Sequence, residues 1–223
     1  MALYRISDLN VEIKTKSPTL AGNIQRYEVT YQANPNITLE MSDDRMLELM
    51  EENEGITADV LESTYMATLY SWALFDYNGF PMRAVGIESD DECVLIAAPY
   101  DESVDLVRLI PRDKAFVYNY PGIRMQDEDY YVFDTPFGLN GDKSVPGKKL
   151  KLRSIIFVDG GRFDSLREIE AKDFVPLFMR AVSLNVRQER TKHTLFILER
   201  VMHRVKFYGV GDLSDLDFIL ERV

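Results

Sequence analysis

The chain has 223 residues, 46% of them hydrophobic and 11% aromatic, which is enough to bury one large core or two small ones. The net charge of -11 argues against a general nucleic-acid-binding protein, and no apolar run approaches the roughly 20 residues that a membrane span needs. Segment 1–10 lacks the apolar stretch of a secretory signal, and the single cysteine, Cys93, excludes an internal disulfide and a thiolate metal cluster. We therefore expect a cytoplasmic protein.

In the first third of the chain, alternating apolar and polar residues predict strands at 10–14, 26–32 and 36–41. Ser42 is a typical N-cap, and the two aspartates after it suit the positive end of a helix dipole, which predicts a helix ending at Gly55. Thr57 caps a second predicted helix over 58–77. Residues expected along one stripe of this helix are Leu61, Tyr65, Thr68, Leu69 and Trp72.

Strands and helices are intermixed in the rest of the chain. Two short apolar strands around an acidic turn at 88–91 predict a hairpin. The two strands of this hairpin are expected at 82–87 and 92–98. Further strands are expected at 114–120, 129–134, 152–159 and 205–210, helices at 103–110, 171–185, 193–205 and 213–223, turns at Gly122 and 126–129, and a loop at 135–148. This order predicts a mixed α/β protein, with a strand and helix region at 1–79 packed on a core at 80–223 in one compact unit.

The stretch from Leu95 to Leu106 begins like a buried strand that feeds a phosphate-binding loop. The order of features from Phe80 to Leu220 resembles the HPr kinase/phosphorylase-like serine kinases, which are relatives of the phosphoenolpyruvate carboxykinases. The segments that carry the resemblance are 80–107, 112–122, 130–141, 150–169 and 197–220. The resemblance implies an HPr kinase/phosphoenolpyruvate carboxykinase-like fold.

The chain departs from that family at the phosphate loop. A P-loop needs glycines that let backbone N–H groups converge on phosphate, a lysine for the phosphate charge and a Ser/Thr hydroxyl for Mg²⁺. The vestigial loop position consists of Ala98, Pro99, Tyr100, Asp101, Glu102, Ser103, Val104 and Asp105. Its three carboxylates would face a polyphosphate, and two like charges about 4 Å apart repel by about 4 kcal/mol at an effective dielectric near 20. Either the loop has lost its chemistry, or a strand–helix unit here never bound phosphate.

Two other positions differ from the family. Arg83 stands where many members have histidine, and Asp113 is a single acidic residue where the family tends to have two. His193 and His203, ten residues apart with no cysteine nearby, make a poor metal pair, and the acidic run 127–129 lacks the ligand spacing of a calcium loop. We therefore expect no catalytic residue, no metal and no cofactor.

The basic strand and the loop before it are the candidate binding surface. Lys149, Lys151 and Arg153 would point the same way from a strand. In the family, the loop with Thr135, Phe137 and Gly138 borders the substrate cleft. The candidate ligand- or partner-binding residues are Arg83, Asp113, Thr135, Phe137, Gly138, Lys151 and Arg153.

The leading hypothesis is a catalytically degenerate HPr kinase-like protein that acts as a cytoplasmic binding or regulatory protein. Its expected partner is another protein or a small anion, and neither nucleic acid nor a membrane. One alternative is an active phosphotransferase or nucleotide-binding protein with a rebuilt site that uses Arg83, Asp113, Lys151 and Arg153. Another is a structural subunit of a larger complex.

Overall fold

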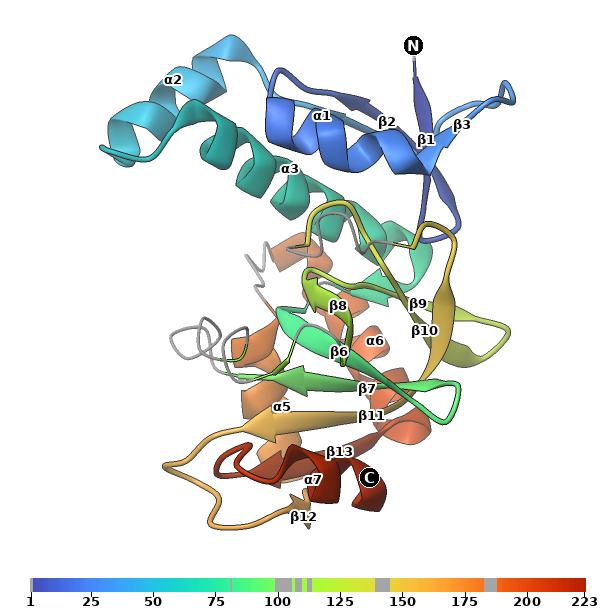
Figure 1. Ribbon diagram of the computed structural model, residues 1–223, viewed down its shortest axis with the longest axis vertical. Coiled ribbons are helices and arrows are strands. Elements are labelled where there is room, and N and C mark those ends of the chain that lie inside the picture. The colour runs from blue at the N-terminus through green and yellow to red at the C-terminus, as the bar shows by residue number, and fades with distance from the viewer. Residues whose placement is uncertain are drawn as a thin grey trace.

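The computed structural model describes residues 2–80, 82–98, 106, 110–111, 114–138, 145–182 and 188–223. Its strands and helices are intermixed, which confirms the predicted mixed α/β class, and they form a smaller N-terminal sheet and a larger core sheet (Figure 1). Within the described ranges, no helix combines the length and the apolar character needed to cross a membrane.

The N-terminal sheet has the strand order β3-β1-β2-β4, with β2 and β4 parallel. Its strands are β1 (Leu3–Ile6), β2 (Leu9–Lys14), β3 (Glu28–Val29) and β4 (Ile37–Glu40). Helices α1 (Pro18–Ile24), α2 (Asp43–Glu52) and α3 (Ala58–Leu74) lie beside it. Alternate residues of β2 face a core that also receives Leu20 of α1 and Met66 of α3. The alternation of apolar and polar residues therefore gives the sheet one apolar face, which packs against α1 and α3.

The core sheet has the strand order β5-β9-β10-β11-β7-β6-β8, and β13 joins it along the second half of β11. Its strands are β5 (Gly79–Phe80), β6 (Ala84–Ser89), β7 (Glu92–Ala97), β8 (Ala115–Asn119), β9 (Gly122–Gln126), β10 (Asp129–Phe133), β11 (Lys149–Val158), β12 (Arg167–Glu168) and β13 (Lys206–Val210). The long strand β11 runs parallel to both β7 and β13 and is an interior strand of the core sheet.

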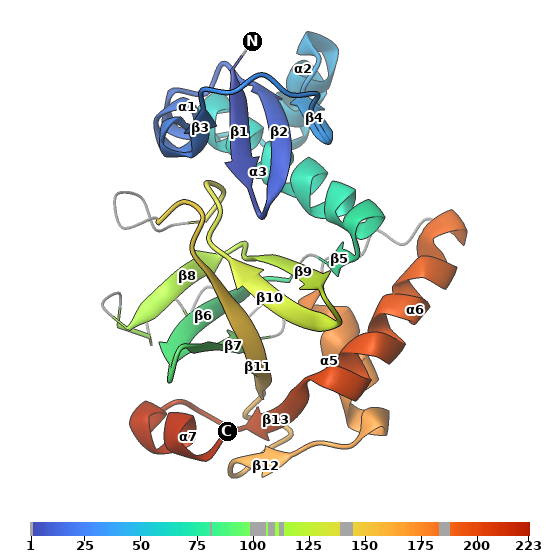
Figure 2. The ribbon, with the colours of Figure 1, turned by 90° about the vertical axis from the view of Figure 1, so that its right-hand side faces the viewer.

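Helices cover both faces of the core sheet (Figure 2). They are α5 (Ala171–Ala181), α6 (Gln188–Arg204) and α7 (Leu216–Arg222). Phe174 of α5 and Val201 of α6 pack in one apolar cluster, and Ile219 of α7 packs in a separate cluster with Ile156. Because both faces are covered, the parallel strands read as nearly continuous apolar runs.

The β1–β2 turn and the end of α3 connect the N-terminal sheet to the core. In the turn, Ser7 accepts hydrogen bonds from the Tyr70 hydroxyl at 2.6 Å and from Arg124 Nη1, through its carbonyl, at 2.5 Å. A 3₁₀ turn, η2 (Phe75–Tyr77), then leads from α3 directly into β5. Side chains of the two parts thus share one buried contact zone.

Several predicted elements are confirmed, including the hairpin around the acidic turn. Ser89 pairs with Glu92, and the turn residues Asp90 and Asp91 both have positive φ, as the favoured two-residue hairpin turns require. The burial alternation along the first half of β11 confirms that Lys149, Lys151 and Arg153 share a face.

Other expectations were wrong. Gly122 begins strand β9 instead of a turn, and only Glu28–Val29 of the predicted strand at 26–32 pairs. Of the predicted α3 stripe only Leu61 is buried; the buried face instead includes Met66, Ala67, Tyr70 and Leu74. This helix packs against the sheet and also enters the core contact zone, so a wider face is covered than a narrow stripe predicts.

Candidate functional site

Ala98, the first residue of the vestigial loop position, follows the end of β7. It is buried and packs in an apolar cluster that also contains Leu106 and Ile110. The remaining residues of the loop position, 99–105, and Asp113 lie outside the described residues. Arg83 is at the same end of the sheet as Ala98, because the next residue, Ala84, pairs with Ala97.

Lys151 and Arg153 lie on the neighbouring strand β11, near the opposite end of the sheet from Ala98. Lys151 is opposite Glu92, the first residue of β7, whereas Phe157 is opposite Ala97, the last. Five residue steps along an extended strand span about 17 Å. The structure therefore does not bring Lys151 together with Arg83, which lies at the Ala98 end of the sheet, although the rebuilt-site hypothesis grouped these two residues.

The basic residues of β11 contact acidic side chains of the chain itself. Lys151 Nζ is 2.9 Å from an oxygen of Asp129, and this hydrogen bond raises the pKa of the lysine. Arg153 Nη1 is 3.4 Å from Asp90, and its Nη2 donates to the carbonyl of Leu220 at 3.3 Å. Each cation of this pair thus has an internal partner.

The predicted loop residues pack inward. The Thr135 hydroxyl donates to the Tyr120 carbonyl at 2.5 Å, and Gly138 is buried. The half-buried ring of Phe137 lies 4.9 Å, centroid to centroid, from the ring of Tyr70 in α3. Phe137 therefore joins the loop to the N-terminal part.

The structure places the remaining candidates as follows. Cys93 is fully buried, and burial raises the pKa of its thiol, so it is an apolar core residue. His203 is exposed on α6, and the side chain of His193 lies outside the described residues. Among the side chains that the structure describes, no group of three or more His, Cys, Asp or Glu could hold a metal ion.

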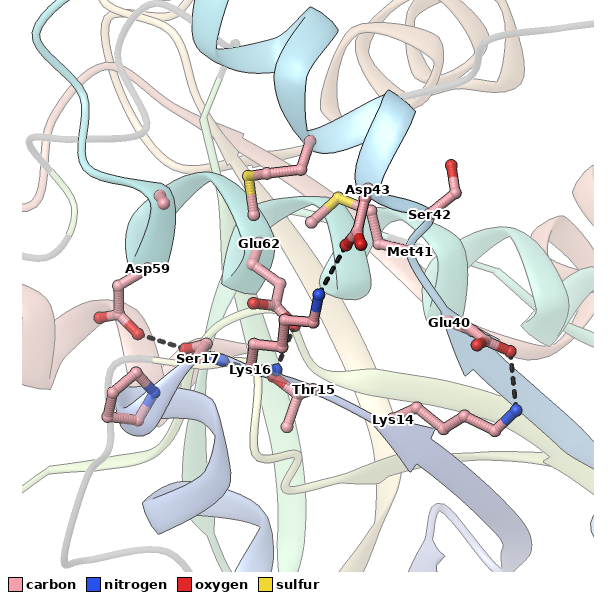
Figure 3. A pocket seen from close by; sticks show the side chains of 13 residues that line it. Lys14, Thr15, Lys16, Ser17, Glu40, Met41, Ser42, Asp43, Asp59 and Glu62 are labelled. Carbon is pink, nitrogen blue, oxygen red and sulfur yellow. Dashed lines mark hydrogen bonds and ion pairs between the residues drawn. The ribbon is translucent and has the colours of Figure 1, made fainter.

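A cavity in the N-terminal part was missed by the sequence analysis. It has a volume of about 490 Å³ and lies between the ends of β2 and β4 and the first turns of α2 and α3 (Figure 3). Its described lining includes the carboxylates Glu40, Asp43, Asp59 and Glu62, the lysines Lys14 and Lys16, and the apolar residues Pro18, Met41, Met46 and Ala58. Carboxylates therefore outnumber lysines in its wall.

Most charges around the cavity form pairs at its rim. Lys14 Nζ is 2.8 Å from Glu40, and Lys16 Nζ is 2.6 Å from Asp43. These hydrogen bonds raise the pKa of both lysines, so both are cations at neutral pH. Hydrogen bonds from the neighbouring hydroxyls of Ser17 and Thr19 lower the pKa of Asp59, which stays ionised.

Glu62 differs from the rim carboxylates because it is only 4% exposed. One of its oxygens, Oε1, accepts a hydrogen bond from the backbone N–H of Lys16 at 2.8 Å. A buried carboxylate gains most from strong donors. A ligand that brings a cationic donor into the cavity would thus meet a matching group.

One local signal could have revealed part of this site. Ser17 followed by Pro18 is a helix-start pattern, and the Ser17 hydroxyl does accept from the Leu20 backbone N–H, at 3.0 Å, as the N-cap of α1. The pairing of β2 with β4, which closes the cavity, depends on residues 26 positions apart, such as Val11 and Ile37.

Comparison with protein-family models and with curated proteins gave no match to the chain.

Proposed function

We propose that this protein is a catalytically degenerate relative of the HPr kinase-like serine kinases that acts in the cytoplasm as a binding or regulatory protein. The observation that carries the proposal is the separation of Lys151 and Arg153 from Ala98 along β7. A phosphate site needs its cations and backbone donors within hydrogen-bond reach of the same group. Residues at opposite ends of two neighbouring strands do not meet that requirement.

The fold supports the family assignment at the level of analogy. The β6–β7 hairpin leads to the loop position, and β7 pairs in parallel with β11, the next predicted family strand. The carboxyl ends of such parallel strands are the usual place for a ligand. The carboxylates at Asp101, Glu102 and Asp105 disfavour a polyphosphate there.

The alternative, an active phosphotransferase, would need a different set of cations. Lys151 and Arg153 already contact Asp129 and Asp90, and moving either to Ala98 would break these contacts. We therefore favour binding over phosphoryl transfer.

Thermal unfolding with and without Mg-ATP or Mg-GTP tests this proposal. A nucleotide at 100 times its Kd would stabilise the fold by about 2.7 kcal/mol, or about 5–10 °C for a chain of this size. We expect no shift with either nucleotide. A shift that disappears in Asp101→Lys would contradict the proposal, because it would place a nucleotide at the loop.

A further inference from the structure

We propose that the cavity and helix α2 together bind a basic amphipathic segment of a partner protein, with one lysine or arginine side chain inserted in the cavity. This inference rests on the proposed binding function and names the class of partner. It depends on three features of the N-terminal part: an exposed apolar strip, an excess of acidic charge, and the buried Glu62.

The apolar strip belongs to helix α2, which lies at the outer edge of the molecule (Figure 1). In this fully described helix none of the ten residues is buried, and Leu47 and Met50 are 60% and 44% exposed. Met46, which lines the cavity, is adjacent on the helix and lies one turn before Met50. We call Met46, Leu47 and Met50 the α2 strip. Apolar surface that continues from a cavity is typical of a binding site.

The residues around the α2 strip are mostly acidic, which favours a positively charged partner. Segment 40–54 contains seven acidic residues and one basic residue. Asp43 and Glu51 lie one helical turn before and after Leu47. This potential attracts a basic segment, and it repels an anionic membrane, a nucleic acid or a second copy of the same face.

The cavity can hold one basic side chain of that segment. The methionines Met41 and Met46 offer flexible apolar walls to the methylene stem of a lysine or arginine. Glu62 offers a buried carboxylate to the charged end. An amphipathic segment would lay its apolar side chains on the α2 strip while this basic residue enters the cavity.

Lys16 occupies part of this position in the unbound protein. Its side chain reaches from the segment between β2 and α1 to Asp43 at the start of α2, across the cavity (Figure 3). Both side chains are mostly exposed, and exposed ion pairs contribute little stability. An incoming basic side chain can therefore displace the Lys16 side chain from the cavity, so Lys16 is an internal competitor of the partner.

The test uses a fluorescein-labelled amphipathic peptide of about 15 residues, built from leucine and lysine at helical three–four spacing. Its affinity for the full chain is measured by fluorescence anisotropy at low and raised salt. We expect Glu62→Gln and Met50→Gln each to weaken binding about tenfold, and Lys16→Ala to tighten it about threefold. We expect raised salt to weaken binding.

Matched controls separate this site from general surface effects. Met179→Gln changes a methionine that is 38% exposed on α5, and Lys114→Ala removes an exposed lysine that pairs with Asp217. Neither should change the affinity. Circular dichroism checks the fold of Glu62→Gln, and Met50→Gln tests the proposal independently because its side chain is on the surface.

Equal affinity of all variants would overturn the proposal, as would equal binding of a peptide with glutamate in place of lysine. Self-association of the protein that Met50→Gln abolishes would also overturn it, because the occupant would then be a second copy. The thermal unfolding experiment with nucleotides tests the proposed function separately. If the peptide does not bind, this inference fails, but the result with Mg-ATP and Mg-GTP is unaffected.

Discussion

Gly122 shows how a single residue joins the two parts of the molecule. It begins β9 next to Ser7 in the β1–β2 turn, and a Cβ built on it would collide with the Ser7 hydroxyl. That hydroxyl also accepts the 2.6 Å hydrogen bond from Tyr70. A side chain at position 122 would therefore push apart a contact that the N-terminal part makes with the core.

We expect Gly122→Ala to lower the free energy of unfolding by about 1–3 kcal/mol, because overpacking forces the neighbouring groups to shift. Urea denaturation measures the change. The control is Gly22→Ala in α1, where a Cβ meets nothing within 4 Å. Alanine there is favoured over glycine by up to about 1 kcal/mol in a helix interior. If Gly122→Ala is as stable as the parent protein, the contact with Ser7 relaxes without cost and the prediction is wrong.

At the scale of elements, tight hairpin turns carry acidic residues in the left-handed conformation. Asp8, Asp90 and Glu128 all have positive φ, which Asp adopts more readily than most residues. Their carboxylates approach Lys149, Arg153 and Arg204 at 3.4, 3.4 and 3.0 Å. The turn tips thus connect the hairpins to later elements of the chain.

The Asp8 turn predicts a pH dependence. Burial raises the pKa of Asp8, but hydrogen bonds from Gln126 and Lys149 outweigh it, so the pKa of the folded state lies below 3.8. In the acid range the unfolded chain therefore binds more protons at Asp8 than the folded protein does. The contribution of ionised Asp8 to the free energy of unfolding is lost as pH falls through 3.8 toward the pKa of the folded state. We expect Asp8→Asn to flatten the fall in unfolding free energy below about pH 5.

Denaturant unfolding at a series of pH values measures this slope. Asparagine accepts the left-handed conformation of position 8, so the substitution changes the charge with little backbone strain. Lys149→Gln should flatten the slope as well, because it removes the cation near Asp8. If both variants keep the parent protein's slope of unfolding free energy against pH, Asp8 has the same pKa in the folded and unfolded chain, and the prediction is wrong.

At the scale of the whole molecule, the loop after β10 reaches from the core to the N-terminal part. Asn23 Nδ2 in α1 donates to the Pro136 carbonyl at 3.4 Å, and the Phe137 ring packs near Tyr70. These contacts join the loop after β10 to α1 and α3. They also give Phe137 an internal role beside the partner-binding role that the sequence predicts.

We expect Phe137→Ala to lower the unfolding free energy by about 2 kcal/mol, since it removes a half-buried aromatic contact between the two parts. Chemical denaturation gives the value, and Phe218→Ala on the exposed surface of α7 is the control. A residue that serves only to anchor a partner would leave the stability of the free protein unchanged. That outcome would contradict the internal role.

The sequence by itself determined the local features of this protein. The acidic turn, the alternation of Lys149, Lys151 and Arg153, and the Ser42 cap of α2 all follow from neighbouring residues. Turn conformation, strand alternation and helix capping depend on a few bonds along the chain, so a short pattern is sufficient to predict them.

Only the tertiary structure decided which of these features meet. The register of β7 against β11 separates Lys151 from Ala98, although both lie on predicted family segments. The cavity around Glu62 forms because β2 pairs in parallel with β4 and because the first turns of α3 pack beside these two strands. Register and pairing are set by the burial of whole sheet faces, and a one-residue slip would move every side chain of a strand to the other face. Register and pairing therefore depend on the packing of the whole core, and they cannot be predicted from any single segment of the sequence.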